Sequence, residues 1–424
     1  MANFLTAGAM AYIDKIVALC GSEHAAWGET FALTYADTLK HALVADGDSR
    51  IFVLTGDIPA MWQRDSSAQL RPYLVPARDD PKLADIIERV IARQFFNMQL
   101  DPYANAFNQS ANNAGYHTDQ TEMTPWIWER KYELDSLCYP VSLAYHFWKT
   151  TGRTAQFDET FQQAIQRLLQ VIVQEQDHQH SPYTFARQDD RPEDTLINGV
   201  GRPVAACGLS WNGFRPSDDA CHYGYLIPSN LFAVVSLRQL AEIYQVVLQQ
   251  PAAQFLALAD EIQAAVMTYG VTKNAVGELI YAFEVDGLGH SLVMDDANVP
   301  NLLALPYLGA VAADDPVYQA TRKTILSHEN PYYYAGTFGA GLGSPHTPAN
   351  YIWPIAKAME GLTTEDRQVK AQILDQLVAT TAGTKMMHEG YDVEDPSRYT
   401  REWFSWANMM FCELVMDYYG ERVD

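Results

Sequence analysis

Residues 79–96 of the chain read DDPKLADIIERVIARQFF, and their pattern decides the fold class. Asp80 has the side chain of an N-cap, and Pro81 stands where a helix accepts proline, at its first position. Apolar residues then recur at the i, i+3, i+4, i+7 and i+8 spacing of one buried helix face: Leu83, Ile86, Ile87, Val90 and Ile91. The stretch therefore predicts a helix packed on one side against a core.

The same helical pattern recurs along the chain, whereas strand-like alternation is scarce. Further helices are expected within residues 157–173, 314–326 and 363–383. Asp315 is the expected cap of the second, and the third is expected to run from a Thr364 cap to Gly383. The strand candidates are short and lie at residues 50–56 and 278–285. We therefore expect an all-α protein.

Long connections separate the predicted helices, and they concentrate Trp, Asp, Glu, Arg and Gly. Loops of this length are uncommon in a compact domain unless they are functional or disordered, and the aromatic content argues against disorder. Connections of this kind between helices are expected when one end of a ring of helical hairpins carries a pocket. We expect residues 1–424 to form a single domain, an α/α toroid.

The charge balance limits the partners. The chain has 29 Lys and Arg against 52 Asp and Glu, a formal charge of −23, which repels phosphate backbones and anionic membrane surfaces. Nucleic acid and membranes are therefore not expected as partners. Asp14 and Lys15 interrupt the apolar run that a signal peptide would need, and five separated cysteines without a CxxC pair predict free thiols. Both features favour a cytoplasmic protein.

The first candidate site segment is GDIPAMWQRDSS, residues 56–67, which contains Trp62, Arg64 and Asp65. A carboxylate and a guanidinium together bind vicinal hydroxyls of a sugar, because one accepts and the other donates hydrogen bonds, while an indole stacks on the C–H face of the ring. The alternative is structural: Asp65 caps a helix that begins near Ser66, and Arg64 pairs with a nearby acid.

The second candidate is WNGFRPSDDACHYGY, residues 211–225, where Asp218 and Asp219 are adjacent. Two close carboxylates in a partly dry site raise one another's pKa, which keeps one protonated as a general acid. One aspartate is expected to cap the following helix, Asp219 being the likelier cap, while the other reaches the ligand. Arg215 is expected to tune the pair. A solvated pair without a role is the alternative. DDAN, residues 295–298, is either another pocket loop or a helix cap.

The third candidate is Glu389, which lies between His388 and Gly390. Its carboxylate is expected at a flexible, exposed turn, a suitable place for a base that positions water, with Arg401 beside it. The sequence HEGYD lacks the second histidine of a zinc protease motif, and no other cluster has the spacing of metal ligands. Neither a catalytic metal nor a cofactor is therefore expected.

Six segments together resemble the glycoside hydrolase family 125 exo-α-1,6-mannosidases, in order and over about residues 25 to 420. They are GDIPAMWQRDSSAQLRPYL, WERKYELDSLCYP, GFRPSDDACHYGYLIPSNLFAVV, MDDANVPNLLALPYLG, GLGSPHTPANYIWPIA and RYTREWFSWANMMFCELV. The resemblance implies an (α/α)6 barrel. It also implies a metal-independent, anomer-inverting enzyme that releases terminal α-1,6-linked mannose from oligosaccharides or N-glycan fragments.

The resemblance assigns roles to individual residues. It implies an aspartate acid, which falls on Asp218 or Asp219 with Asp218 as the first choice, and a glutamate base, which falls on Glu389. The family's motif around the base reads HES followed by an aromatic, whereas this chain has HEGY, so Gly390 replaces a serine. That departure affects a side-chain contact and leaves the carboxylate in place. The expected substrate-binding residues are Trp62, Arg64, Asp65, Arg215, His388 and Arg401.

Two other functions remain as alternatives. Sugar epimerases and isomerases also use α/α toroids, but they move protons with histidines, and no facing pair is evident among His117, His222, His346 and His388. A non-catalytic glycan-binding protein is the other alternative, although binding alone gains little from burying carboxylates. The expected partner in each case is a sugar, for the mannosidase a mannose-containing oligosaccharide. The sequence indicates no oligomeric state.

Overall fold

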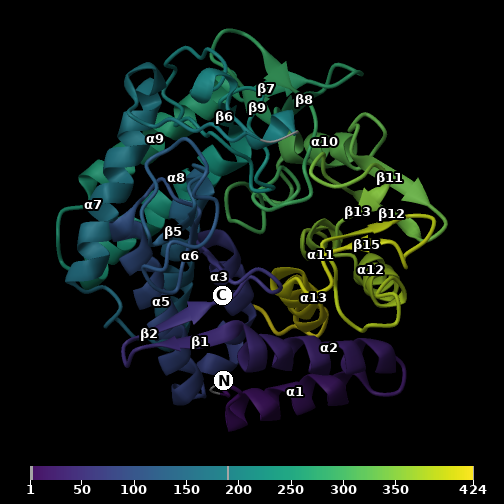
Figure 1. Cartoon of the computed structure of the whole chain (residues 1–424). Helices are drawn as coiled ribbons and strands as arrows, with labels where there is room; N and C mark the ends of the chain where they lie inside the picture. The colour runs from purple at the N-terminus through teal and green to yellow at the C-terminus, as the bar shows by residue number, and fades with distance from the viewer. Residues whose placement is uncertain (1–2, 189–190, 424) are drawn as a thin grey trace. The chain divides into compact units, whose positions relative to one another are not determined.

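A computed structural model describes residues 3–188 and 191–423 of the chain, and helices dominate it (Figure 1). The α-helices in that part are α1 (Ala7–Cys20), α2 (Ala25–Asp37), α3 (Gln63–Leu70), α4 (Leu74–Ala77), α5 (Pro81–Leu100), α6 (Leu134–Thr151), α7 (Glu159–Gln174), α8 (Ile227–Glu242), α9 (Ala253–Tyr269), α10 (Pro316–Ile325), α11 (Pro354–Leu362), α12 (Arg367–Ala379) and α13 (Ser405–Tyr418). The all-α prediction agrees with this helical content.

The strands are short, none exceeding four residues within the described ranges. They are β1 (Leu43–Asp46), β2 (Arg50–Val53), β3 (Met61–Trp62), β4 (Ala106–Phe107), β5 (Ile127–Glu129), β6 (Tyr225–Leu226), β7 (Val271–Lys273), β8 (Leu279–Tyr281), β9 (Glu284–Val285), β10 (Ser291–Leu292), β11 (Tyr333–Gly336), β12 (Gly339–Leu342), β13 (Tyr351–Ile352), β14 (Gly390–Asp392) and β15 (Tyr399–Thr400). The two strand candidates of the sequence correspond to β2 and to β8 with β9.

The chain divides into two compact units. The first comprises Met1–Gln94, Leu143–Gln156 and Tyr333–Asp424, and the second comprises Phe95–Ser142 and Phe157–Tyr332. Each unit is assembled from separate pieces of chain. The single domain and its ring of hairpins remain predictions.

In the first unit, α13 is the central helix and packs against α2, α3, α11 and α12. Its sequence, SWANMMFCELVMDY, is apolar on nearly all sides, and every residue from Ser405 to Met416 is buried. A helix that is apolar all round is stable only when it is surrounded. Beside it, α1 and α2 lie side by side (Figure 1). This unit also contains the small antiparallel sheets β1–β2, β11–β12 and β13–β14–β15, and β14 directly follows Glu389.

In the second unit, α8 and α9 pack together, and a small sheet, β10–β9–β6, lies at the start of α8. Strand β9 is central: Glu284 pairs with Leu226 of β6 on one side and with Leu292 of β10 on the other. Because β6 ends where α8 begins, this sheet fixes the chain immediately after residues 211–225. The sheet therefore supports the segment that contains the paired aspartates.

Two predicted helix caps, Asp80 and Asp315, are confirmed. The Asp80 carboxylate accepts hydrogen bonds from the backbone N–H groups of Lys82 and Leu83, and α5 begins at Pro81. The five apolar residues of its predicted face are buried. Asp315 caps α10, where its Oδ1 accepts from the backbone N–H of Tyr318.

The Thr364 cap and the Gly383 end were wrong. Helix α12 begins at Arg367 and ends at Ala379, and Asp366 caps it by accepting from the backbone N–H groups of Gln368 and Val369. Asp366 lies two positions closer to the helix than Thr364, so its carboxylate reaches the free N–H groups of the first turn. The Thr364 hydroxyl instead accepts a hydrogen bond from the backbone N–H of Asp366.

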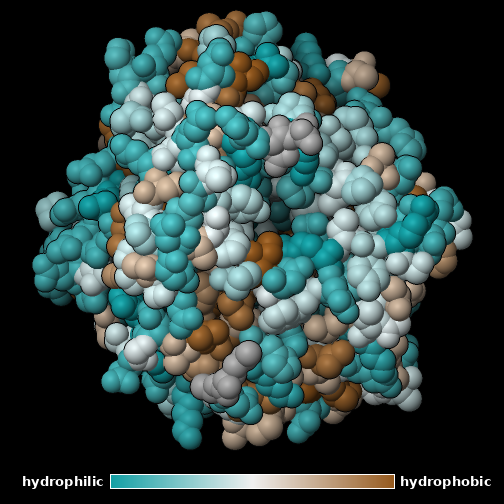
Figure 2. Space-filling view, viewed as in Figure 1, coloured by the Kyte–Doolittle hydropathy of each residue, from teal (hydrophilic) through white to brown (hydrophobic). Residues whose placement is uncertain are grey.

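The surface agrees with the acidic composition. Hydrophilic residues cover most of the visible face, and hydrophobic ones are scattered among them (Figure 2). Within residues 3–188 and 191–423, no helix is long and apolar enough to cross a membrane. All five cysteines are free thiols, as predicted.

Candidate active site

Asp218 has a strained backbone that the surrounding chain holds in place. Its φ is 67°, in the left-handed region that a residue with a side chain rarely adopts. The backbone carbonyl of Asp218 accepts from Lys131 Nζ at 2.7 Å, and its N–H donates to the Arg215 carbonyl at 2.9 Å. The side chain is partly exposed, and Oδ1 accepts from Asn105 Nδ2 at 3.3 Å. Hydrogen bonds therefore fix the backbone of Asp218, while solvent still reaches its side chain.

Asp219 has a different environment, since its exposed fraction is 0%. Its Oδ1 accepts from Arg191 Nη2 at 3.1 Å, and its backbone carbonyl accepts from the Arg215 N–H at 2.7 Å. The two adjacent aspartates therefore do not share one environment, and the alternative of a solvated pair is wrong for Asp219.

Neither aspartate caps the next helix, so the expected cap at Asp219 was wrong. Helix α8 begins at Ile227 with Leu226 as its N-cap residue, and no side chain bonds the cap. Strand β6 comes between the aspartates and the helix and moves the helix start away from them. Pro228 in the first turn reduces the need for a cap, because proline has no N–H to satisfy.

Arg215 pairs with Glu284 rather than with the aspartates. Its Nε donates to Glu284 Oε1 at 2.5 Å, and both side chains are buried. Burial disfavours the Arg215 cation, but the adjacent Glu284 carboxylate outweighs this effect and raises the pKa of Arg215 above its ordinary value. Sequence reasoning missed Glu284. Glu284 is one of two acids in the strand stretch at residues 278–285, and nothing local distinguishes it as a partner of Arg215.

Lys131 connects the aspartate segment to a network of acids. Its buried ammonium donates to Asp194 Oδ1 at 2.8 Å as well as to the Asp218 carbonyl, and it lies 3.9 Å from Glu129 Oε1. Burial disfavours the Lys131 cation, but the charges of Glu129 and Asp218 outweigh it and raise the pKa of Lys131. Asn105 joins the same network, since its Nδ2 also donates to Glu129 Oε2 at 3.0 Å.

The DDAN segment packs against the aspartate segment. Ser217 Oγ donates to Asp296 Oδ2 at 2.7 Å, and Asn298 Nδ2 donates to the Pro216 carbonyl at 2.7 Å. Burial raises the pKa of Asp295 well above its ordinary value, although backbone N–H groups bonded to its carboxylate oppose that shift. No α-helix begins here within the described chain, since the next is α10. The interpretation of DDAN as a helix cap is therefore wrong, and its place in a pocket stays a prediction.

In the first unit, Trp62, Arg64 and Asp65 are all buried at the junction of β3 and α3. Helix α3 begins at Gln63 rather than near Ser66, with Trp62 as its N-cap residue, so Asp65 lies inside the first turn and is not the cap. Arg64 Nε lies 3.5 Å from Asp65 Oδ1, so Arg64 pairs with a nearby acid as the structural alternative expects, and sugar binding by the two side chains stays a prediction.

Glu389 is more ordered than expected. Its exposed fraction is 9%, it directly precedes β14, and its backbone N–H donates to the Thr400 carbonyl at 3.1 Å. The prediction of a flexible, exposed turn was therefore wrong, because β14 pairs with β13 and β15 on its two sides. The carboxylate lies 3.9 Å from Arg401 Nη1.

Arg401 is held beside Glu389 from several directions. Its φ is 52°, and its Nε donates to Asp57 Oδ1 at 2.9 Å. Burial disfavours the cation, but the hydrogen bond to Asp57 and the charge of Glu389 outweigh it and raise the pKa of Arg401. The predicted neighbourhood of Glu389 and Arg401 is confirmed, and Asp57 is an additional member that sequence reasoning missed.

His388 lies beneath this cluster with an exposed fraction of 1%. Its Nδ1 lies 3.0 Å from the Arg401 carbonyl, and its ring stacks on Tyr399 with centroids 3.6 Å apart. Since a carbonyl only accepts, Nδ1 donates. Burial lowers the pKa of His388 below its ordinary value. These contacts support Arg401, and a direct contact of His388 with substrate stays a prediction.

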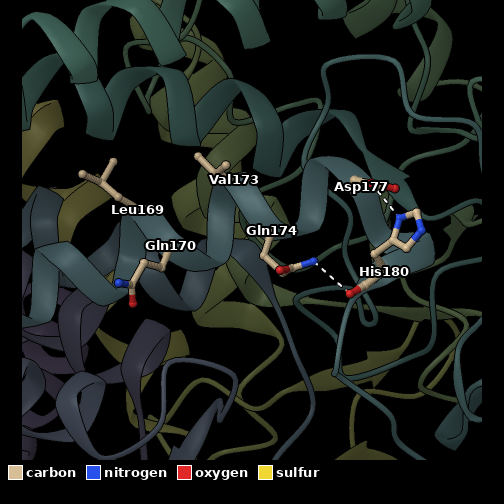
Figure 3. Close-up of a pocket in the computed structure, with 6 residues that line it drawn as sticks. All are labelled: Leu169, Gln170, Val173, Gln174, Asp177 and His180. Carbon is tan, nitrogen blue, oxygen red and sulfur yellow. Dashed lines mark hydrogen bonds and ion pairs between the residues drawn. The ribbon is translucent and has the colours of Figure 1, made fainter.

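No group of three or more His, Cys, Asp or Glu side chains in the described ranges has the geometry to hold a metal ion. A surface groove of about 680 Å³ runs along α7 in the second unit (Figure 3). It is lined by Leu169, Gln170, Val173, Gln174, Asp177 and His180. It contains none of the predicted site residues, and its Asp177 pairs with His180 at 2.8 Å.

A family model and a solved structure identify the same family. A family model of the metal-independent α-mannosidases, glycoside hydrolase family 125, matches residues 24–416. A solved α-mannosidase structure from Streptococcus pneumoniae, described as a non-productive complex with α-1,6-mannobiose, is 53% identical with a TM-score of 0.95. The match covers 97% of this chain and 98% of the streptococcal one.

More distant proteins are also similar. The "Meiotically up-regulated gene 157 protein" of Schizosaccharomyces pombe is 39% identical over 409 residues, which is 91% of this chain and 80% of that protein. A bacterial glucoamylase complexed with acarbose has a TM-score of 0.64 at 13% identity, over 97% of this chain and 58% of its own, and shows likeness of fold alone. The family match and the streptococcal structure together show that the chain belongs to glycoside hydrolase family 125, the metal-independent α-mannosidases.

Proposed function

We propose that this protein is an inverting exo-α-1,6-mannosidase that releases terminal mannose from oligosaccharides or N-glycan fragments. The observation that carries the proposal is the 53% identity to a streptococcal α-mannosidase whose structure contains α-1,6-mannobiose. Membership of the α-mannosidase family supports hydrolysis of a mannoside bond. The linkage, the action at chain ends and the stereochemistry are the parts that we infer.

We assign the acid to Asp218 and not to Asp219. A general acid must reach the glycosidic oxygen, and Asp218 is partly exposed whereas Asp219 has an exposed fraction of 0%. Asp219 is also engaged elsewhere, since its Oδ1 accepts a hydrogen bond from Arg191 Nη2 at 3.1 Å. The role of Asp219 is then structural: it ties residues 191 and 219 together.

We assign the base to Glu389. In an inverting reaction the acid protonates the departing oxygen while the base takes a proton from a water that attacks the anomeric carbon. In inverting glycosidases in general, the acid and the base flank the glycosidic bond roughly 6.5 to 9.5 Å apart, so that the water fits between base and sugar. Arg401 Nη1 lies 3.9 Å from Glu389 Oε1, so a side chain stands beside the base to orient it.

The remaining roles concern the bound mannose. Arg64 and Asp65 bind its hydroxyl groups, and Trp62 packs against its ring, since the guanidinium donates, the carboxylate accepts and the indole stacks. Arg401 orients the base, and His388 supports Arg401 through its carbonyl. Arg215, predicted to bind substrate, is engaged with Glu284 and acts through the aspartate segment. An (α/α)6 barrel formed by the single chain remains the proposed architecture.

Incubation with α-1,6-mannobiose tests the proposal. We expect free mannose, with β-mannose appearing before α-mannose in an NMR time course, and little release from α-1,2- or α-1,3-mannobiose. A sugar isomerase would change the mannose unit without cleaving the disaccharide, and a glycan-binding protein would leave it intact. Either result, or α-mannose as the first product, would contradict the proposal.

A further inference from the structure

The buried Glu284 carboxylate accepts hydrogen bonds from several residues of the segment that contains the two aspartates. Its exposed fraction is 0%. Oε1 accepts from Arg215 Nε at 2.5 Å, while Oε2 accepts from the backbone N–H groups of His222 and Tyr223, both at 2.8 Å. One carboxylate therefore bonds the chain both before and after Asp218.

The segment between these attachment points is a closed loop. The Arg215 N–H donates to the Asp219 carbonyl at 2.7 Å, and the Cys221 N–H donates to the Gly213 carbonyl at 2.9 Å. Phe214 and Ala220 form an isolated antiparallel bridge. These bonds close the loop internally, and Glu284 attaches its two ends to the rest of the unit.

Glu284 is itself held firmly. It lies on β9, the central strand of the β10–β9–β6 sheet, opposite Leu226 and Leu292. A residue on a central strand has its backbone hydrogen bonds in the sheet, so its side chain starts from a fixed position. Glu284 is therefore part of a regular sheet, whereas the aspartate loop that it binds lies outside the named helices and strands.

The loop needs such an anchor because Asp218 has an unfavourable backbone. Its φ of 67° is unfavourable for a residue with a side chain, and such a conformation persists only when the surroundings enforce it. Lys131 restrains the Asp218 carbonyl from one side, and Glu284 restrains the flanking residues from the other.

We propose that Glu284 is a positioning residue for the acid: by binding Arg215 and the N–H groups of His222 and Tyr223, it sets the orientation of the Asp218 carboxyl group. The inference rests on the proposed function, since it presumes that Asp218 donates the proton. Glu284 touches no substrate. It acts on the reaction only through the loop.

The test separates acid positioning from general damage. A misplaced acid slows the release of a poor leaving group, such as the second mannose of α-1,6-mannobiose, but hardly affects dinitrophenolate, which leaves without a proton. In Glu284→Gln one of the two accepting oxygens becomes an NH₂ group. That donor then faces another donor, either the Arg215 guanidinium or the backbone N–H groups of His222 and Tyr223, and the hydrogen bond is lost. We expect kcat on mannobiose to fall about a hundredfold, as for a misplacement of about 1 Å, with KM little changed. The rate on dinitrophenyl α-mannoside should fall less than about threefold, by the same reasoning.

The matched control is Asp286→Asn, two residues further along. Asp286 is also buried and accepts from two backbone N–H groups, those of Leu288 and His290, but these lie in the following turn and not in the aspartate loop. We expect this variant to lower thermal stability while leaving the ratio of the two rates unchanged. Glu284→Asp, which keeps the charge on a shorter side chain, should restore part of the mannobiose rate.

Each result decides the question. A selective loss on mannobiose in Glu284→Gln, with partial recovery in Glu284→Asp, supports the proposal. Equal losses on both substrates, no loss, or the same selectivity in Asp286→Asn overturns it. If Glu284→Gln does not fold, the selectivity is measured on Glu284→Asp, and a rate ratio equal to that of the wild type overturns it. A wild-type protein that releases no mannose from mannobiose contradicts the proposed function itself, and the positioning role with it.

Discussion

Replacing each of the two adjacent aspartates by asparagine should affect different properties, turnover for Asp218 and stability for Asp219. In Asp218→Asn the proton donor is lost, and turnover of α-1,6-mannobiose should fall at least a thousandfold, about 4 kcal/mol of transition-state stabilisation. The folded state should change little, because the side chain is partly exposed and asparagine still accepts the hydrogen bond that Asn105 donates at 3.3 Å. Asp218→Asn should therefore be inactive and stable.

Asp219→Asn should mainly lose stability. Its carboxylate is buried and accepts a charge-assisted hydrogen bond from Arg191, a kind of bond worth about 1.5 to 3 kcal/mol. The Arg191 side chain is 38% exposed, so water compensates part of the loss, and we expect a cost of about 2 kcal/mol. That corresponds to a fall in Tm of a few degrees for a protein of this size.

The assay measures mannose release and thermal unfolding on the wild type, Asp218→Asn and Asp219→Asn. The matched control is Arg191→Gln, which removes the guanidinium partner of Asp219 and should reproduce the loss of stability without a thousandfold loss of turnover. The reasoning is refuted if turnover of mannobiose falls a thousandfold in Asp219→Asn while Asp218→Asn keeps more than about a tenth of the wild-type turnover. A tenfold fall corresponds to only about 1.4 kcal/mol of transition-state stabilisation, too little for the loss of the acid.

Glu389→Gln should lower turnover of mannobiose at least about a thousandfold, because an amide cannot accept the proton of water; near-normal turnover would remove Glu389 from the mechanism. Exhaustive EDTA treatment should leave activity intact, and a loss restored by calcium or zinc would contradict metal independence. Asp366→Ala should cost about 1 kcal/mol in thermal unfolding and Thr364→Ala less, because Asp366 caps α12; the reverse order would contradict the observed cap. Burial lowers the pKa of His388, so the folded state binds fewer protons than the unfolded state, and stability should fall as the pH decreases through about 6.5. Thermal melts should show a smaller fall in His388→Gln, and an equal fall would refute this.

The helices were predictable because their signals are local. A cap and the face of a helix are set by residues within four or so positions, which is why Asp80 and Asp315 were identified correctly. The prediction of the α12 cap was wrong although its signal is also local. Two candidate residues lie close together, and only the observed hydrogen bonds distinguish Asp366 from Thr364.

The candidate site was predictable in its members but not in their partners. Both aspartates, Glu389 and Arg401 were singled out from the sequence, and the proximity of Glu389 to Arg401 is confirmed. Glu284 was missed, because its hydrogen bond to Arg215 joins residues 69 positions apart. No local pattern indicates such a contact.

The sequence by itself determined the helical class, the helix caps at Asp80 and Asp315, the acidic composition and the family, since each depends on composition, on neighbouring residues or on the order of motifs. Only the tertiary structure decided that Asp219 is buried against Arg191 while Asp218 remains partly exposed, and that Glu284 holds both ends of their loop. The physical reason is that burial and ion pairing depend on which distant segments meet. Two identical side chains, adjacent in the chain, therefore have different chemistry.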